Sequence, residues 1–263
     1  MININRVVGL LTQEFFITLR SLEVIIDILI SPLTSLVIFG FLALFLSGTN
    51  IFIAHGLLSG VLLWQTIFII QYSVSVGSLW NIWSRNLSNM FISPISLTEY
   101  IFTYSISGII KAGIIFLLSS FLTLIIFHFN ILSLGLLNLL LYFVNIIFFA
   151  LWLGIILLGL IFRFGTRIQA FAWGVLPVFQ SLSAAYYPVS ILPKPLQYIA
   201  NLIPVTYVFE AMRENLVDAS VISWNLLITG FVLNIIYFIF AVIFFSFMFK
   251  ESKRTGQFTR LEG

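Results

Sequence analysis

The sequence predicts an all-α membrane protein: an N-terminal amphipathic interfacial helix, six transmembrane helices, and re-entrant outer helices between the fifth and sixth spans. Of its 263 residues, 61% are hydrophobic and only 8% are charged, and the mean hydropathy is +1.15. A soluble domain of this length would need more polar residues for its surface. The apolar runs reach the roughly 20 residues that a helix needs to cross a bilayer, without the short alternating segments of a membrane barrel.

Residues 1–24 are predicted to form the interfacial helix. Along 4–22, apolar residues recur at helical spacing on one face, while Arg6, Gln13 and Arg20 lie on the opposite face. A helix of this kind lies in the plane of the membrane surface. The alternative is a long cytoplasmic extension of the first span. The stretch includes Glu14, which argues against a cleavable signal peptide.

The chain is expected to be one permease domain, 1–263, made of the interfacial helix, a six-span bundle over 25–249 and a cytoplasmic tail over 250–263. Each predicted span is long enough to cross the hydrocarbon core. The spans are 25–47, 57–80, 101–127, 136–162, 168–188 and 225–249.

The basic residues predict the orientation. With the N-terminus in the cytoplasm and six spans, nine of the twelve Lys and Arg residues lie inside, as the positive-inside rule requires. Lys194 and Arg213 lie outside, and Lys111 lies within a span. We therefore expect a multi-pass protein of a cytoplasmic membrane with both termini inside. The inside residues are Arg6, Arg20, Arg85, Arg163, Arg167, Lys250, Lys253, Arg254 and Arg260.

Residues 189–224 are too apolar for an ordinary outer loop, yet contain Pro193, Pro195 and Pro204. A seventh span would place the basic tail outside, and the prolines interrupt any single helix long enough to cross. We expect short helices that enter the outer leaflet and return, separated near Pro204. Glu210 and Arg213, three residues apart on a helix, are expected to pair.

The sequence shows no motif for catalysis, for a bound cofactor or for a metal site, so we do not expect an enzyme. Its basic residues flank apolar spans, which is an orientation signal rather than a nucleic-acid footprint. Asp27 and Lys111 lie within spans, where charge is costly, and they are a candidate intramembrane pair. The alternative to pairing is that the long Lys111 side chain extends its amine toward the inner membrane surface.

The loop after the second span is predicted to carry a short amphipathic helix early in 84–100. Ser93-Pro94 then interrupts that helix. Ser96, followed three residues later by Glu99, forms a predicted capping box at the start of the third span. Glu99 therefore has a structural role, and contact with a partner is the weaker interpretation.

Two segments resemble type-2 ATP-binding-cassette transport permeases. One is Asn86-Leu87 with Ser93-Pro94-Ile95-Ser96 and Glu99 after the second span. The other is Tyr187-Pro188-Val189-Ser190-Ile191-Leu192-Pro193, followed by Ile203-Pro204-Val205-Thr206-Tyr207 and Glu210-Ala211-Met212-Arg213. Ile203 stands where that family usually has Asn. The order of parts matches over essentially the whole chain.

The resemblance implies the membrane-spanning subunit of an exporter in a prokaryotic inner membrane. It implies a second copy of this chain or a close paralogue, and two copies of a separate ABC ATPase subunit that bind ATP and Mg. Its cargo would be amphiphilic: a polysaccharide, a lipid-linked glycan or a drug-like compound. The ATPase-docking residues would be Arg6, Arg20, Arg85, Asn86, Leu87, Asn89, Met90, Ser93, Pro94 and Ser96.

We expect the segment 186–215 before the last span to close the outer end of the path as a gate, because it is apolar, interrupted by prolines and placed outside by the charge rule. Its residues would be Tyr187, Pro188, Pro193, Pro204, Tyr207, Glu210 and Arg213. Two rival functions stay open on the sequence. A secondary transporter would normally show ion-coupling groups inside the membrane, and a polytopic enzyme acting on lipid or glycan would need clustered polar groups. Neither pattern is clear here.

Overall fold

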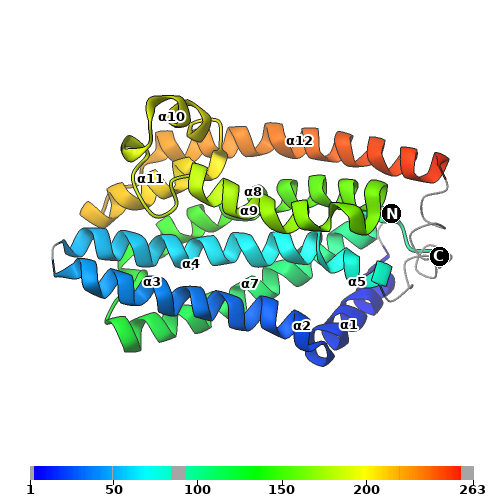
Figure 1. Cartoon of the computed structure of the whole chain (residues 1–263), viewed down its shortest axis with the longest axis horizontal. Helices are drawn as coiled ribbons and strands as arrows, with labels where there is room; N and C mark the ends of the chain where they lie inside the picture. The colour runs from blue at the N-terminus through cyan, green and yellow to red at the C-terminus, as the bar shows by residue number, and fades with distance from the viewer. Residues whose placement is uncertain (1–2, 49, 84–92, 219, 256–263) are drawn as a thin grey trace.

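The computed structural model describes residues 3–48, 50–83, 93–218 and 220–255, and every regular element in these ranges is a helix. Long helices run side by side, and α1 and the C-terminal end of α12 lie at the same end of the bundle (Figure 1). The helices are α1 (Ile4–Arg20), α2 (Leu22–Ile25), η1 (Ile26–Ile30), α3 (Ser31–Ser47), α4 (Ile51–Val74), α5 (Gly77–Trp83), α7 (Leu97–Phe127), η2 (Ile131–Leu134), α8 (Leu136–Phe164), η3 (Gly165–Ile168), α9 (Gln169–Leu182), η4 (Val189–Ile191), α10 (Lys194–Ala200), α11 (Pro204–Val217) and α12 (Trp224–Arg254).

Within the described ranges, five helical stretches are long and apolar enough to cross a membrane, which confirms a multi-pass helical protein. The stretches are Leu22–Ser47, Ile51–Trp83, Leu97–Phe127, Leu136–Leu182 and Trp224–Arg254. The fourth has 47 residues, and a straight helix of that length would extend about 70 Å. It is instead a hairpin, because Gly165 has φ 63° and the Phe179 ring of α9 returns to Phe149 and Trp152 of α8.

The largest differences from the predicted span boundaries are six residues, at the start of α4 and at the end of α9. Helix α4 begins at Ile51 rather than 57, since the Asn50 side chain accepts hydrogen bonds from the first backbone N–H groups of the helix. Helix α9 ends at Leu182 rather than 188, where the chain turns through Ala184 with φ 54°.

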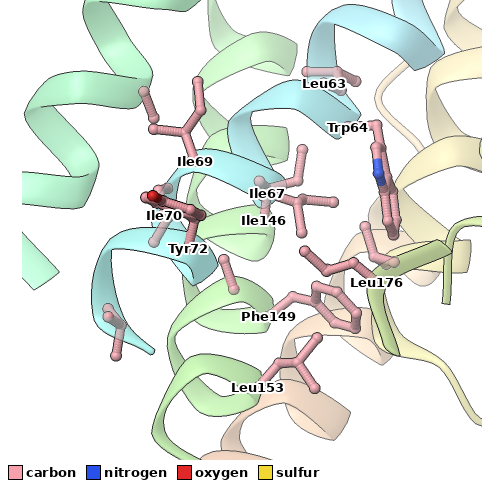
Figure 2. Close-up of a cluster of buried hydrophobic side chains, with 14 of the residues drawn as sticks. Leu63, Trp64, Ile67, Ile69, Ile70, Tyr72, Ile146, Phe149, Leu153 and Leu176 are labelled. Atoms are coloured by element: carbon pink, nitrogen blue, oxygen red, sulfur yellow. The ribbon is translucent and has the colours of Figure 1, made fainter. Parts of the chain in front are cut away.

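Helix α4 forms the centre of the bundle. Its side chains pack against Ile146, Phe149 and Leu153 of α8 and against Leu176 of α9 (Figure 2). In a bilayer this packing depends on close van der Waals fit, because lipid is as apolar as the helix surfaces. Gly60 shows how close that fit is: a Cβ there would lie 2.2 Å from the carbonyl oxygen of Ala185.

Polar side chains join α8 to α12. The Trp152 indole N–H donates to the Asn234 side chain at 3.0 Å, and the Asn234 amide donates to the Asn145 carbonyl at 3.0 Å. Near the other end of the same pair, the Ser252 hydroxyl donates to the Phe162 carbonyl at 2.6 Å. Such bonds between spans contribute roughly 0.6–2 kcal/mol each, so they fix how the two helices align.

Helix α1 is separate from the first span. Ser21 has extended dihedrals, φ −94° and ψ 112°, and its hydroxyl caps α2. The two are therefore not one continuous helix, while the interfacial placement of α1 and its alternative, a cytoplasmic extension of the first span, both stay predictions. The buried side chains of α1 are Val7, Leu10 and Glu14, which face the bundle, while much of the predicted apolar face is exposed, including Phe15.

Candidate functional site

The start of α1 and the start of α7 meet at one buried carboxylate, Glu99. Its oxygens accept from the backbone N–H of Ser96 and of Asn3, both at 2.8 Å, while the Ser96 hydroxyl accepts from the Glu99 N–H at 3.2 Å. The predicted capping box is confirmed. The Arg6 guanidinium lies 3.7 Å from the same carboxylate and donates to the Pro94 carbonyl. This network ties the beginning of α1 to the 93–97 segment.

The residues predicted for ATPase docking are only partly brought together. Arg6, Pro94 and Ser96 share the Glu99 network, and Ser93 is adjacent in sequence. Arg20 lies at the far end of α1, with its guanidinium over the Phe16 ring at 5.2 Å. The remaining five, Arg85, Asn86, Leu87, Asn89 and Met90, fall outside the described residues, as does the predicted amphipathic helix.

The predicted Asp27–Lys111 pair is not formed. The Lys111 ammonium lies 2.6 Å from the Glu14 carboxylate, and only 12% and 7% of these two side chains are exposed. Burial raises the pKa of Glu14 above its ordinary 4.5, while the adjacent Lys111 charge opposes that shift. The sequence analysis did not identify Glu14 of α1 as the partner of Lys111 in α7, because Glu14 was considered only as evidence against a signal peptide.

Asp27 has a different partner. It lies in η1, a π-helical turn within the first span, and its carboxylate accepts from the Tyr72 hydroxyl at 2.9 Å. The Trp80 indole N–H is 3.4 Å from the same hydroxyl. Single π-helical turns inside α-helices are frequent at functional positions. Here the turn connects the first span to α4 and α5.

Helix α1 runs beside α7, as two contacts between these helices show. Asn3 contacts Glu99 and Glu14 contacts Lys111, which are separations of 11 and 12 residues along the two helices. Both correspond to about 17 Å at helical rise. Because the Asn3 N–H donates to the buried Glu99 carboxylate and Glu14 forms a buried ion pair with Lys111, α1 is joined to α7 at both ends of this stretch.

At the opposite end of the bundle, the predicted Glu210–Arg213 pair is confirmed at 2.9 Å. Glu210 also accepts from the Val189 N–H at 2.8 Å, and Arg213 donates to the Ala184 carbonyl at 2.9 Å. The pair thus joins α11 to both ends of the turn that follows α9. We call these four residues the outer ion-pair cluster.

The prolines and tyrosines of the predicted gate have local structural partners. Pro188 and Pro193 precede η4 and α10, and Pro204 begins α11, so the break near Pro204 is confirmed. The Tyr187 hydroxyl donates to the Ser181 carbonyl at 2.6 Å, and the Tyr207 hydroxyl donates to the Asn201 carbonyl at 2.9 Å. Both tyrosines stabilise turns.

A cavity of about 290 Å³ lies between α3, α4 and α9, and the sequence reading missed it. Its polar lining includes Ser31, Ser35, Gln65, Gln180 and Tyr186 among aromatic side chains. Gln65 donates to the Pro32 carbonyl at 2.7 Å, while its buried Oε1 has no hydrogen-bond partner in the described part of the chain. Gln65 and Gln180, amides within apolar runs, were the available signal.

These features define a class of protein: a multi-pass helical membrane protein with a partly polar cavity between three helices. A helix is tied to the bundle at one end, and an ion-paired helical segment lies at the other. The family described as ABC-2 type transporter matches residues 6–217, and the chain belongs to that family. Its members are membrane components of transporters, and membership implies association with an ABC ATPase subunit. No curated protein matches the chain.

Proposed function

We propose that this chain is the transmembrane subunit of an exporter that moves an amphiphilic cargo across the cytoplasmic membrane of a prokaryote. Two copies, or one copy and a close paralogue, would form the path. Two separate ATPase subunits would bind ATP and Mg and drive the cycle. The cavity between α3, α4 and α9 in a chain of this family is the observation that carries the proposal.

Six crossings with both termini in the cytoplasm are supported by the hairpin of α8 and α9. The end of the bundle that holds the N-terminal part of α1 also holds the ends of α8 and α12, because Arg163 donates to Thr255 at 2.8 Å. Most described basic residues lie at this end, whereas Lys194 and Arg213 lie beyond α9. The positive-inside rule favours a cytoplasmic location for the basic end.

The ATPase is proposed to dock at this end, on the segment from Arg85 to Ser96 and on α1. The exposed apolar side of α1 suits the membrane interface, while Glu14 and Arg6 hold the helix to α7. When the ATPase closes, displacement of the docked segment would tilt α7. The populations of inward-open and outward-open arrangements would then shift.

The cavity suits an amphiphile because aromatic walls and amide groups occur together. Trp64, Phe68 and Trp173 offer apolar surface, and the free Oε1 of Gln65 can accept a hydrogen bond from a cargo hydroxyl or amide. At the outer end, α10 and α11 are proposed to lie at the depth of the outer leaflet. The outer ion-pair cluster would hold them over the exit.

A matched pair of substitutions on α3 tests this proposal. Ser35 lines the cavity, whereas its neighbour Thr34 is exposed on another face of the same helix. In the complex purified from its native host, Ser35→Trp should remove a co-purifying glycan or lipid-linked compound that mass spectrometry detects with wild type. Thr34→Trp should retain it. If Ser35→Trp retains the compound at the wild-type level while the complex assembles, the cavity is not the cargo path.

A further inference from the structure

A second, larger cavity lies on the outside of the bundle, between α7 and α12. It has a volume of about 570 Å³ and is open laterally, since Phe102 and Val242 on its two walls are 45% and 44% exposed. Helix α8 forms its floor through Leu151 and Ile155. We call this cavity the α7–α12 groove. It is separate from the cavity between α3, α4 and α9.

The groove has the dimensions of one lipid chain. Its lining runs from Leu97 to Ile109 on α7 and from Phe238 to Lys250 on α12, a separation of twelve residues on each helix. That is about 18 Å at helical rise, close to the roughly 15 Å depth of a single leaflet's hydrocarbon. The groove therefore starts at a membrane surface and ends near the bilayer centre.

The walls of the groove are effectively apolar, although serines line them. The Ser105 hydroxyl donates to the Ile101 carbonyl and the Ser246 hydroxyl donates to the Val242 carbonyl, each within its own helix. These hydroxyls therefore have no need of a polar ligand. An extended hydrocarbon chain fits such a surface better than a polar cargo does.

Among the described residues that line the groove, the one charged side chain is Lys250, at the surface end. Its neighbours on α12 are engaged: Lys253 lies 4.9 Å from the Phe249 ring centre, and Arg254 pairs with Glu251 at 3.0 Å. Within the described residues Lys250 has no acidic partner within 4 Å. An ammonium at the membrane surface above an apolar groove is complementary to a phosphate attached to an acyl chain.

We infer that the α7–α12 groove is a binding site for an anionic glycerophospholipid of the leaflet at the basic end. One acyl chain lies between α7 and α12, and the phosphate contacts Lys250. A comparable cavity of about 570 Å³, between α8, α9, α10 and α12, has no charged side chain among the described residues that line it. It lacks the headgroup contact and carries no such assignment. The bound acyl chain would fill the space between α7 and α12 above α8.

The test uses the full chain in its complex, reconstituted in nanodiscs of equimolar phosphatidylglycerol and phosphatidylcholine, then released and analysed by native mass spectrometry. Wild type should retain a phosphatidylglycerol in preference to phosphatidylcholine. Lys250→Gln should lower that preference about fivefold, the factor expected for one basic residue at an anionic surface. Lys253→Gln, whose ammonium lies over Phe249, should change it less.

Val242→Trp should fill the groove and remove the retained lipid, and Ser105→Phe provides a second filling variant on the opposite wall. Ile243→Trp is the matched control, because Ile243 follows Val242 and is 64% exposed outside the groove. Retained lipid unchanged in both filling variants would overturn the assignment, as would an unchanged preference in Lys250→Gln. Unchanged lipid with a loss of dimer in Val242→Trp would instead identify the groove as an interface between copies of this chain.

Discussion

Replacement of Lys111 by Met should destabilise the protein by leaving the Glu14 carboxylate buried without its partner. The two groups are 2.6 Å apart, and their side chains are only 12% and 7% exposed, so solvent screens the pair weakly. Removing one member of a buried ion pair costs about 3–5 kcal/mol. Met keeps the length and most of the apolar volume of the Lys stem, so packing changes contribute little. We expect a loss within that range at neutral pH.

The pH dependence has a defined sign. Burial already raises the pKa of Glu14 above 4.5, and removing the Lys111 charge removes the interaction that opposes the shift. A carboxyl with a raised pKa in the folded state destabilises that state above its folded pKa. This loss of stability decreases as the pH falls from the pKa of Glu14 in the folded state toward its pKa in the unfolded state, below which both states bind the proton. The stability gap between Lys111→Met and wild type should therefore narrow on acidification.

The assay is the free energy of unfolding in mixed detergent micelles, followed by helicity during titration with a denaturing detergent. The double variant Glu14→Gln/Lys111→Met should recover most of the loss, because no unpaired charge remains buried. Two results would refute this reasoning. One is a loss in Lys111→Met below about 1 kcal/mol, typical of an exposed pair. The other is a double variant that is no more stable than Lys111→Met.

Two further predictions concern the outer end. Gly60→Ala should lower the thermal midpoint of the complex, because the new methyl group would lie 2.2 Å from the Ala185 carbonyl oxygen. Gly174→Ala is the control, since the space around Gly174 is open, and it should leave the midpoint unchanged. Equal midpoints for the two variants would contradict the close approach at Gly60. Glu210→Gln should impair export more than subunit assembly, since the neutral side chain keeps its shape but loses the ionic contact with Arg213. Size-exclusion chromatography measures assembly, and an export assay measures transport. Lost assembly with normal export per complex would indicate a purely structural role.

The sequence predicted those features whose partners are close in the chain. The Ser96–Glu99 capping box and the Glu210–Arg213 pair each span three residues, so helical geometry alone determines them. The break before Pro204 follows from the missing N–H and fixed φ of proline. These constraints act before any tertiary packing is known.

Features that depend on packing between distant segments were not predictable in the same way. Lys111 pairs with Glu14, 97 positions earlier, and helical spacing gave no reason to choose it over Asp27. The cavity requires α3, α4 and α9 to face one another, and although Gln65 and Gln180 mark polar positions on two of these helices, the sequence pattern does not specify which helix faces meet. The buried face of α1 was not predictable for the same reason: Glu14 is a charged residue, and its burial depends on the ion pair with Lys111 of α7.

The central claim is that this chain forms the membrane path of an ATP-driven exporter. The most direct measurement is transport in sealed vesicles that contain the chain with its co-purified ATPase, using the amphiphile recovered from the complex as the probe. The probe is expected to cross only when ATP and Mg are present on the ATPase side, and dissipating ion gradients with an ionophore should have no effect. Transport that continues without ATP and stops when the ion gradient is dissipated would contradict it.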